Sequence, residues 1–150
     1  MKIAIASDHA GYDYKNILVP FLKSQGFQVD DLGGYSREPS DYPDHAADVA
    51  RVIIEKTAHR GILICGSGVG VSVAVNKFRG VRGAVCHDSY SAHQGVEHDN
   101  ANVLCIGERI VGIELVKEIV LAFVHATFSN EERHVKRLKK IQAIEDQNMK

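Results

Sequence analysis

The residues best suited to chemistry stand close together in a glycine-rich stretch, residues 62–74. This stretch begins as an apolar run, passes through a turn with three glycines, and continues in a helical pattern. Cys65 and Ser67 lie inside the turn. Glycines let backbone N–H groups approach a ligand closely, and a helix N-terminus carries a partial positive charge that favours an anion or a thiolate. The pattern therefore predicts an anion bound against a reactive Cys65.

Polar residues elsewhere in the chain supply candidate proton donors and phosphate ligands. Asp8 and His9 follow the first apolar run, and His98 precedes the apolar run 102–106. Arg133 and Arg137 are four residues apart, so they share one face of a predicted helix and suit a phosphate through bidentate hydrogen bonds. Plainer interpretations are a helix cap for Asp8, a surface histidine for His98 and a solvated face for the arginines.

The sequence lacks the full signatures of nucleotide and metal binding. A P-loop ends in Gly-Lys-Ser/Thr, which the glycine turn does not. A Rossmann fingerprint has a glycine where Val71 stands, although Asp88 lies about 20 residues further on, where a ribose-binding acid would be. The eight histidines include no pair with a metal-ligand spacing and a third partner. The turn is thus a partial match for dinucleotide binding, and we expect no cofactor and no metal.

The composition is that of an ordinary globular protein. A length of 150 residues suits one domain with a single core. The formal net charge of −1 gives no support for a nucleic-acid or membrane partner. We expect no secretory signal, and no apolar run approaches the ~20 residues of a membrane span. The three cysteines match no zinc or disulfide spacing, so we expect a cytoplasmic protein with free thiols, of which Cys86 and Cys105 lie in the core.

Apolar runs alternate with helical patterns along the whole chain. The runs predict strands over residues 2–7, 27–32, 61–65, 81–86 and 102–106. Helical patterns fill most of the intervals and end with a basic helix over about residues 130–146. This alternation predicts a single domain over residues 1–150 of the α/β class. Its three-layer, doubly wound, Rossmann-like fold has a five-stranded parallel sheet in the order 2-1-3-4-5, with helices on both faces.

Ligands of such sheets bind beyond the carboxyl ends of the strands. Asp8, His9 and Cys65 are expected there. A thiol can act as a base or a nucleophile, and histidines can transfer protons. The residues alone therefore predict cofactor-free chemistry on a small phosphorylated molecule.

Seven short motifs carry a more specific signal. In chain order they are Ser-Asp-His-Ala-Gly (7–11), Asp-Tyr-Pro (41–43), Cys-Gly-Ser-Gly-Val-Gly (65–70), Ala-Val-Asn-Lys (74–77), His-Asp-Asn-Ala-Asn-Val-Leu (98–104), Gly-Glu-Arg (107–109) and Arg-His (133–134). Each is weak alone, but together they resemble the type B ribose-5-phosphate isomerase family from residue 1 to about residue 141. That family includes the subunits of galactose-6-phosphate isomerase and some allose-6-phosphate isomerases.

The resemblance implies an enzyme that interconverts ribose 5-phosphate and ribulose 5-phosphate through an enediolate, without metal or cofactor. Cys65 matches the base that moves a proton between C1 and C2. Ser67 matches a hydroxyl that assists proton movement between O1 and O2. His98 matches the residue that opens the furanose ring, with Asp8 nearby.

The resemblance also implies a set of substrate-binding residues. The matches to phosphate ligands are His9, Arg109, Arg133 and Arg137. The backbone N–H groups implied to hold the developing oxyanion are those of Gly66, Ser67, Gly68, Val69 and Gly70. Asp8, Tyr42 and Asp99 match positions that contact the sugar.

The partner implied by the resemblance is a second copy of the chain. Members of the family form homodimers, some of them paired into tetramers, and each active site is built from both chains. His98 and Arg109 therefore need not lie beside Cys65 within one chain. The preferred sugar stays open, because an isomerase of a six-carbon sugar phosphate would carry the same motifs. A sugar-phosphate-binding regulatory module without turnover is the alternative of another class.

Two departures from the family pattern concern binding residues. The familiar order after the histidine is Asn-Asp, whereas Asp99 and Asn100 stand here. This order puts a carboxylate where an amide usually faces the sugar, unless the loop is shifted by one residue so that Asn100 takes that place. Glu131 and Glu132 replace two glycines before Arg133, with an apparent one-residue insertion. Acids are favourable at a helix start but would weaken phosphate binding if they pointed inward, so we expect both to face solvent.

Overall fold

Five strands form a parallel sheet in the computed structural model, which describes residues 1–149. The strands are β1 (Lys2–Ser7), β2 (Gln28–Asp31), β3 (Arg60–Cys65), β4 (Gly83–Val85) and β5 (Val103–Gly107). The helices are α1 (Tyr12–Ser24), preceded by the 3-10 turn η1 (His9–Gly11), α2 (Tyr42–Ile54), α3 (Val69–Val75), α4 (Ser89–Asp99), α5 (Ile113–His125) and α6 (Glu132–Asn148). None of these helices is long and apolar enough to cross a membrane.

The apolar runs form strands because both faces of the inner strands are covered. In β1 and β3 every residue after the first is buried, and β5 is buried throughout. Such strands show no polar–apolar alternation, since neither face meets water. The helices are instead amphipathic. In α2 the buried residues Ala46, Val49, Ala50 and Ile53 recur every three or four positions, and a proline lies in its first turn.

The order of the last two strands differs from the prediction. The sheet runs 2-1-3-5-4, so β5 lies between β3 and β4, whereas the predicted order placed β4 beside β3. An inner strand must be apolar on both faces, which β5 is along its whole length. The three residues of β4 are only half-buried or exposed, so this short strand suits an edge. The parallel class and the first part of the order are confirmed.

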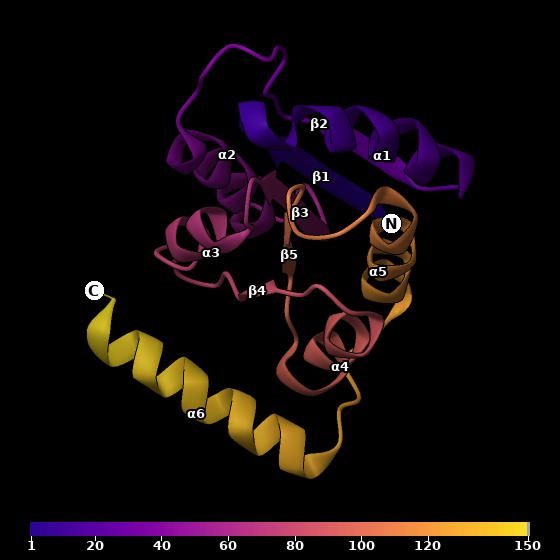
Figure 1. Cartoon of the computed structure of the whole chain (residues 1–150). Coiled ribbons are helices and arrows are strands. Elements are labelled where there is room, and N and C mark those ends of the chain that lie inside the picture. Colours follow the sequence, from indigo (N-terminus) through magenta and orange to yellow (C-terminus); the bar gives the residue numbers. More distant parts are fainter. Residues whose placement is uncertain (150) are drawn as a thin grey trace.

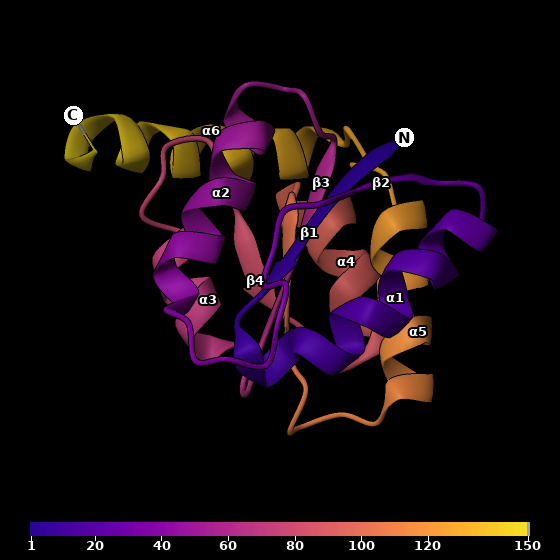
Figure 2. The same cartoon turned by 90° about the horizontal axis from the view of Figure 1, so that it is seen from above.

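Helices cover both faces of the sheet, as predicted. The helices α1, α4 and α5 pack on one face, and α2 and α3 pack on the other (Figure 1). Successive strand residues point to opposite faces, so Ile62 belongs to the first core and Leu63 to the second. The two cores hold the strands rigidly between them. The turns that follow β1 and β5 lie together at the edge of the sheet formed by the carboxyl ends of the strands. The helix α6 lies at the opposite edge, near the amino ends (Figure 2).

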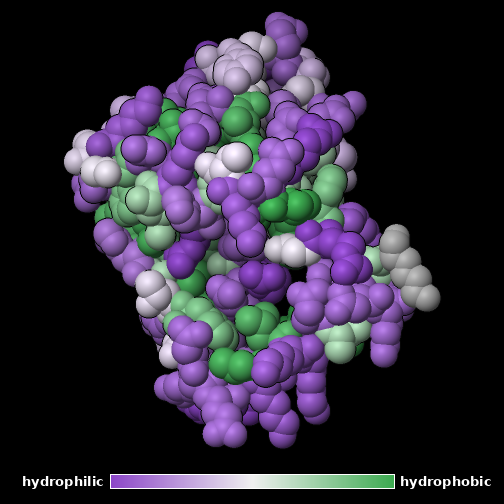
Figure 3. Space-filling view, turned by 180° about the vertical axis from the view of Figure 1, so that it is seen from behind, coloured by the Kyte–Doolittle hydropathy of each residue, from purple (hydrophilic) through white to green (hydrophobic). Residues whose placement is uncertain are grey.

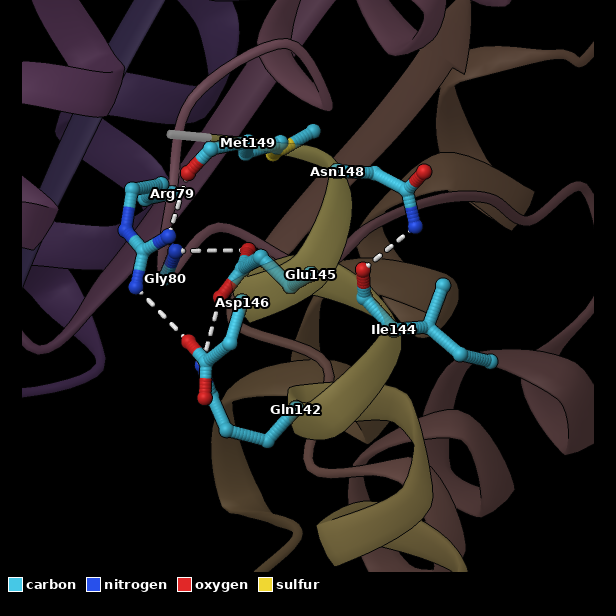
Figure 4. Close-up of polar contacts among 8 residues, drawn as sticks. All are labelled: Arg79, Gly80, Gln142, Ile144, Glu145, Asp146, Asn148 and Met149. Carbon is cyan, nitrogen blue, oxygen red and sulfur yellow. Dashed lines mark hydrogen bonds and ion pairs between the residues drawn. The ribbon is translucent and has the colours of Figure 1, made fainter.

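The last helix, α6, lies outside both helical layers. Its start packs against α4, and its end is held by the connection between α3 and β4 (Figure 4). There Arg79 Nη2 donates to Asp146 Oδ1 at 2.7 Å, and the N–H of Gly80 donates to Glu145 Oε1 at 2.9 Å. Between these two ends a hollow separates α6 from the rest of the chain, and apolar side chains border it (Figure 3). The helix α6 is therefore held at both of its ends and separated from the rest of the chain in between.

Candidate active site

A cavity of about 350 Å³ opens at the carboxyl ends of β1 and β3. Its walls come from the turn after β1, the start of α2, the glycine turn after β3 and the turn after β5. The structure brings eight of the predicted site residues to this cavity: Asp8, His9, Tyr42, Cys65, Gly66, Ser67, Gly70 and Arg109. Ala10 and Ile110, to which no role was assigned, complete the lining. These segments meet because neighbouring parallel strands end at the same edge of a sheet.

The glycine turn holds the thiol and the hydroxyl by backbone hydrogen bonds. Cys65 is the last residue of β3 and is 4% exposed. The N–H of Gly68 donates to Cys65 Sγ at 3.1 Å, so the thiol is held in a fixed position in the turn. The N–H of Val69 donates to Ser67 Oγ at 3.2 Å. Two N–H groups are thus used inside the turn, and the residues of the turn that line the cavity beside Cys65 are Gly66, Ser67 and Gly70.

Two glycines of this turn are required by close packing. Gly68 has a φ of +78°, and a Cβ there would lie 2.9 Å from the backbone carbonyl carbon of Ile106. A Cβ on Gly70 would lie 2.9 Å from the ring of Tyr42. The turn therefore rests directly on β5 and on the first residue of α2. Close packing therefore requires Gly68, one of the two glycines that partly matched a nucleotide fingerprint.

Asp8 and His9 are positioned by the turn after β1 and by the loop before α2. The carboxylate of Asp8 accepts from the N–H groups of Ala10 at 3.0 Å and Gly11 at 3.2 Å, so the side chain caps η1 while it lines the cavity. The N–H of Ser40 donates to His9 Nδ1 at 3.2 Å. An accepting Nδ1 leaves the proton of a neutral imidazole on Nε2. His9 can therefore offer an N–H to an anion in the cavity.

Arg109 lies against the glycine turn of its own chain. Its N–H donates to the carbonyl of Gly66 at 3.1 Å, and its Nη1 would lie 3.1 Å from a Cβ at Gly66. The preceding residue, Glu108, accepts from the N–H of Tyr14 at 2.7 Å and so joins this turn to the start of α1. Burial raises the pKa of Glu108, and the hydrogen bond from Tyr14 opposes that rise. Arg109 is thus available to a ligand of the same cavity as Cys65.

Four predicted site residues, His98, Asp99, Arg133 and Arg137, lie at the opposite edge of the sheet. The helix α4 starts near the carboxyl end of β4 and runs for 11 residues, roughly 16 Å, towards the edge where β5 begins. His98 and Asp99 are its last two residues. The start of α6, with both arginines, packs beside them. A single chain therefore does not bring these four residues to the cavity.

The ring of His98 is held by two neighbours. Gln94 Nε2 lies 3.1 Å from His98 Nδ1, and because an amide nitrogen only donates, the proton of a neutral His98 sits on Nε2. The imidazole of His134 stacks on that of His98 with ring centroids 3.9 Å apart. Both rings are therefore fixed in orientation.

His134 is a candidate that the sequence motifs quoted but to which no role was assigned. It is 1% exposed, Ser129 Oγ lies 2.6 Å from its Nδ1, and its Nε2 is buried without a hydrogen-bond partner among the described residues. Burial lowers the pKa of His134, and the positive charges of His98 and Arg133 lower it further. A buried, neutral imidazole with an unsatisfied nitrogen suits a ligand from outside the chain. The sequence signal was a histidine on the inward face of an otherwise charged helix start.

The two departures from the family pattern also have a structural setting. Asn100 ends α4 in the left-handed region with a φ of +51°, which asparagine tolerates better than most residues. Asp99 is exposed beside it. Glu131 and Glu132 are exposed, as expected, but the Glu131 carboxylate also contacts Arg133 Nε at 3.0 Å.

The other two cysteines are core residues, as predicted. Cys86 is 5% exposed, and Cys105 is fully buried. Burial raises the pKa of Cys86 to about 11 and raises that of Cys105 as well. All three thiols are free. Cys65 is the cysteine that reaches the cavity.

Fold and cavity together define a doubly wound α/β protein with a binding site at the carboxyl ends of its strands. Residues 3–141 match the family model described as Ribose/Galactose Isomerase. The chain is 44% identical over 144 residues to ribose-5-phosphate isomerase B of Escherichia coli (strain K12), covering 96% of each chain. It is 41% identical over 132 residues to D-erythrulose-4-phosphate isomerase of Pectobacterium atrosepticum, covering 85% of each.

Solved structures give the same result. Ribose-5-phosphate isomerase B of Clostridium thermocellum superposes with a TM-score of 0.95 at 45% identity, covering 98% of this chain and 99% of that one. The chain belongs to the ribose/galactose isomerase family. The resemblance seen in the seven motifs is thereby confirmed.

Proposed function

We propose that the protein is a cofactor-independent aldose–ketose isomerase that interconverts ribose 5-phosphate and ribulose 5-phosphate, with Cys65 as the base. The observation that carries this proposal is the cavity in which Cys65 meets the glycine turn, Asp8, His9 and Arg109. The relative named ribose-5-phosphate isomerase B supports the five-carbon substrate. Free thiols suit a reducing compartment, so we place the reaction in the cytoplasm.

The proposed chemistry is a proton transfer between two neighbouring carbons. The Cys65 thiolate removes the proton from C2 of the open-chain aldose, and the electron pair forms a C1=C2 double bond as negative charge moves to O1. N–H groups of the glycine turn donate to that oxygen and stabilise the enediolate. The O2 proton passes to O1 with the help of the Ser67 hydroxyl. The Cys65 thiol then gives its proton to C1, which leaves the ketone at C2 and restores the thiolate.

Ring opening and part of the phosphate binding are assigned to a second copy of the chain. This assignment follows from the position of His98 and the two arginines at the far edge of the sheet. A neutral His98 with its proton on Nε2 is a donor for the ring oxygen. Across the interface, Arg133 and Arg137 would bind the phosphate, and His134 would find there the hydrogen-bond partner that its Nε2 lacks among the described residues. His9 and Arg109 contribute from the first copy.

The remaining contacts of the proposal concern the sugar. Tyr42 and Asp8 line the cavity, so their polar groups are available to sugar hydroxyls. Asp99 would arrive beside His98 from the second copy. The resulting enzyme is a homodimer with two composite sites, and pairing of dimers into a tetramer is compatible with it.

A four-carbon sugar phosphate is the second candidate substrate. It is favoured by the 41% identity to an enzyme named D-erythrulose-4-phosphate isomerase. The reaction at C1 and C2 is the same for sugars of four, five or six carbons. The distance between the thiol and the phosphate ligands therefore decides which sugar is turned over.

One experiment separates these possibilities. The purified protein is incubated in D2O with ribose 5-phosphate, D-erythrulose 4-phosphate or allose 6-phosphate, and NMR follows isomerisation and deuterium incorporation. Turnover of ribose 5-phosphate with the highest kcat/KM supports the proposal. Faster turnover of the four- or six-carbon sugar would replace the substrate but keep the chemistry. Binding without any conversion would leave a regulatory sugar-phosphate-binding module.

A further inference from the structure

Glu131 brings a negative charge into the cluster of groups that is proposed to bind phosphate. Its Oε2 accepts from Arg133 Nε at 3.0 Å and lies 3.9 Å from His134 Nδ1. The N–H of Glu131 donates to Ser129 Oγ at 3.2 Å, which fixes the backbone just before α6. The carboxylate therefore occupies one side of the Arg133 guanidinium.

The electrostatic surroundings of Glu131 favour its charged form. The hydrogen bond from Arg133 and the charge of that guanidinium hold the pKa of Glu131 below its usual range, and His134 and His98 act in the same direction. These are the same side chains that the proposed function assigns to ring opening and phosphate binding. The cluster thus already holds one anion, and that anion belongs to the chain itself.

We infer that Glu131 is an affinity-setting residue that competes with the substrate phosphate for Arg133. The inference rests on the proposed function, because it takes Arg133 as a phosphate ligand. A phosphate can still reach the two terminal nitrogens of the guanidinium while Glu131 holds Nε. It then binds an arginine whose charge is partly compensated, close to a carboxylate that repels it. Glu131 therefore weakens phosphate binding without abolishing it.

The opposite effect, in which Glu131 helps by orienting Arg133, is the weaker of the two. The ion pair is more than half exposed on both sides, and exposed pairs contribute little to the ordering of a side chain. Repulsion by the carboxylate acts instead on a ligand with close to two negative charges, so it is about doubled relative to a single charge. Removal of the Glu131 charge should therefore tighten phosphate binding.

Glu132 provides a matched control. It carries the same charge one residue further on, is also exposed, and lines a separate groove of α6 with Val135 and Lys136. Glu131→Gln and Glu132→Gln thus change the net charge equally and keep the side-chain length. Only the first removes a carboxylate from Arg133.

The test measures binding of inorganic phosphate by isothermal titration calorimetry, together with kcat and KM for ribose 5-phosphate. Glu131→Gln is expected to lower the phosphate Kd and the KM about three- to ten-fold with kcat within about two-fold, and Glu132→Gln to leave all three within about two-fold. In the background of Arg133→Ala, the effect of Glu131→Gln on Kd should largely disappear. Raised salt should shrink the difference between wild type and Glu131→Gln.

An unchanged or weaker phosphate Kd in Glu131→Gln would overturn the inference, as would an equal gain in Glu132→Gln. The proposed function fails separately, if the wild-type protein binds phosphate but isomerises no sugar phosphate. The calorimetric comparison still decides the role of Glu131 in that case, because it does not depend on turnover.

Discussion

Three titratable side chains of the proposed site are each held by one hydrogen bond that determines what the free atom can do. Cys65 Sγ accepts from the N–H of Gly68, which holds the sulfur in the turn beside the cavity. The Nδ1 atoms of His9 and His98 accept from Ser40 and Gln94, so both neutral imidazoles carry their proton on Nε2. Local geometry thus positions the proposed base Cys65, the proposed ring-opening donor His98 and the proposed phosphate ligand His9.

Replacement of Cys65 is the direct test of the base. Cys65→Ala removes the only proton acceptor proposed for C2, so turnover of ribose 5-phosphate should be lost, while the affinity for inorganic phosphate stays within several-fold. Steady-state kinetics and calorimetry measure the two quantities. Cys105→Ala serves as the control, because that thiol is fully buried and has a raised pKa. Near-normal turnover in Cys65→Ala would remove Cys65 from the mechanism.

Glu108 predicts a particular pH dependence of stability. Burial raises its pKa in the folded chain, so the folded state binds a proton more readily than the unfolded state. Its contribution is therefore most favourable below the ordinary glutamate pKa of about 4.3 and is lost as the pH rises through the raised folded value. Urea unfolding of wild type and Glu108→Gln at several pH values should show wild type gaining stability relative to the variant on acidification. A constant difference would contradict the shift.

At the scale of elements, the strands and helices were predictable from the sequence, but the order of β4 and β5 in the sheet was not. Apolar runs predicted all five strands to within a few residues, and helical patterns predicted helices in most of the intervals between them. The exchange of β4 and β5 escaped because periodicity along the chain says little about which strands are neighbours. The stronger clue was the shortness of the apolar run in β4, which follows Arg82 and consists only of Gly83, Ala84 and Val85.

The candidate site was predictable to a similar degree. The residues that follow β1, β3 and β5 lie together because parallel strands have their carboxyl ends at the same edge of a sheet. The role of packing in the glycine turn was hidden, since contacts of Gly68 with β5 and of Gly70 with Tyr42 join segments far apart in sequence. The buried position of His134 depends likewise on α4, which lies about 35 residues earlier in the chain.

Two glycines with positive φ, Gly68 in the glycine turn and Gly80 between α3 and β4, should differ in how much their replacement lowers the free energy of unfolding. Gly68 and Gly80 have φ values of +78° and +80°, but a Cβ at Gly68 would collide with the backbone of β5, whereas Gly80 faces open space. Gly80→Ala should cost about 1–2 kcal/mol, the conformational penalty alone. Gly68→Ala should cost roughly 2 kcal/mol more, because the backbone of β5 must shift. Thermal or urea unfolding measures both, and equal costs would argue against the close packing.

The end of β2 predicts unequal effects for the two adjacent acids Asp30 and Asp31. Lys15 is 1% exposed and donates to both oxygens of Asp31 at 2.8 Å, whereas the neighbouring Asp30 pairs with Lys2 at the surface. Asp31→Ala would leave a buried ammonium without its partner and should cost about 3 kcal/mol. Asp30→Ala should cost less than about 1 kcal/mol. Chemical unfolding gives both values, and a cost for Asp31→Ala as small as that for Asp30→Ala would show that Lys15 finds another partner.

At the scale of the whole molecule, the sheet separates the two halves of the proposed site. Cys65 and its cavity lie at the carboxyl edge, while His98 and the start of α6 lie at the amino edge. The helix α6 lies outside both helical layers, and a hollow lies beside its middle part (Figure 3). Apolar side chains border that hollow, which is consistent with an interface to a second copy. In a dimer, the carboxyl edge of one copy can then meet the amino edge of the other, so that each site combines residues of both copies.

Mixing of inactive variants tests this arrangement. Cys65→Ala and His98→Ala chains should each be inactive as homodimers. After random exchange of equal amounts of subunits, about half of the dimers contain one chain of each kind, and one of the two sites in such a dimer is native if the site takes Cys65 from one chain and His98 from the other. Activity should therefore recover to about a quarter of the wild-type value. Cys65→Ala mixed with Cys65→Ser should recover none, because no native thiol is present. Absence of recovery in the first mixture, with subunit exchange verified by mass spectrometry, would place both residues in one chain's site and overturn the composite arrangement.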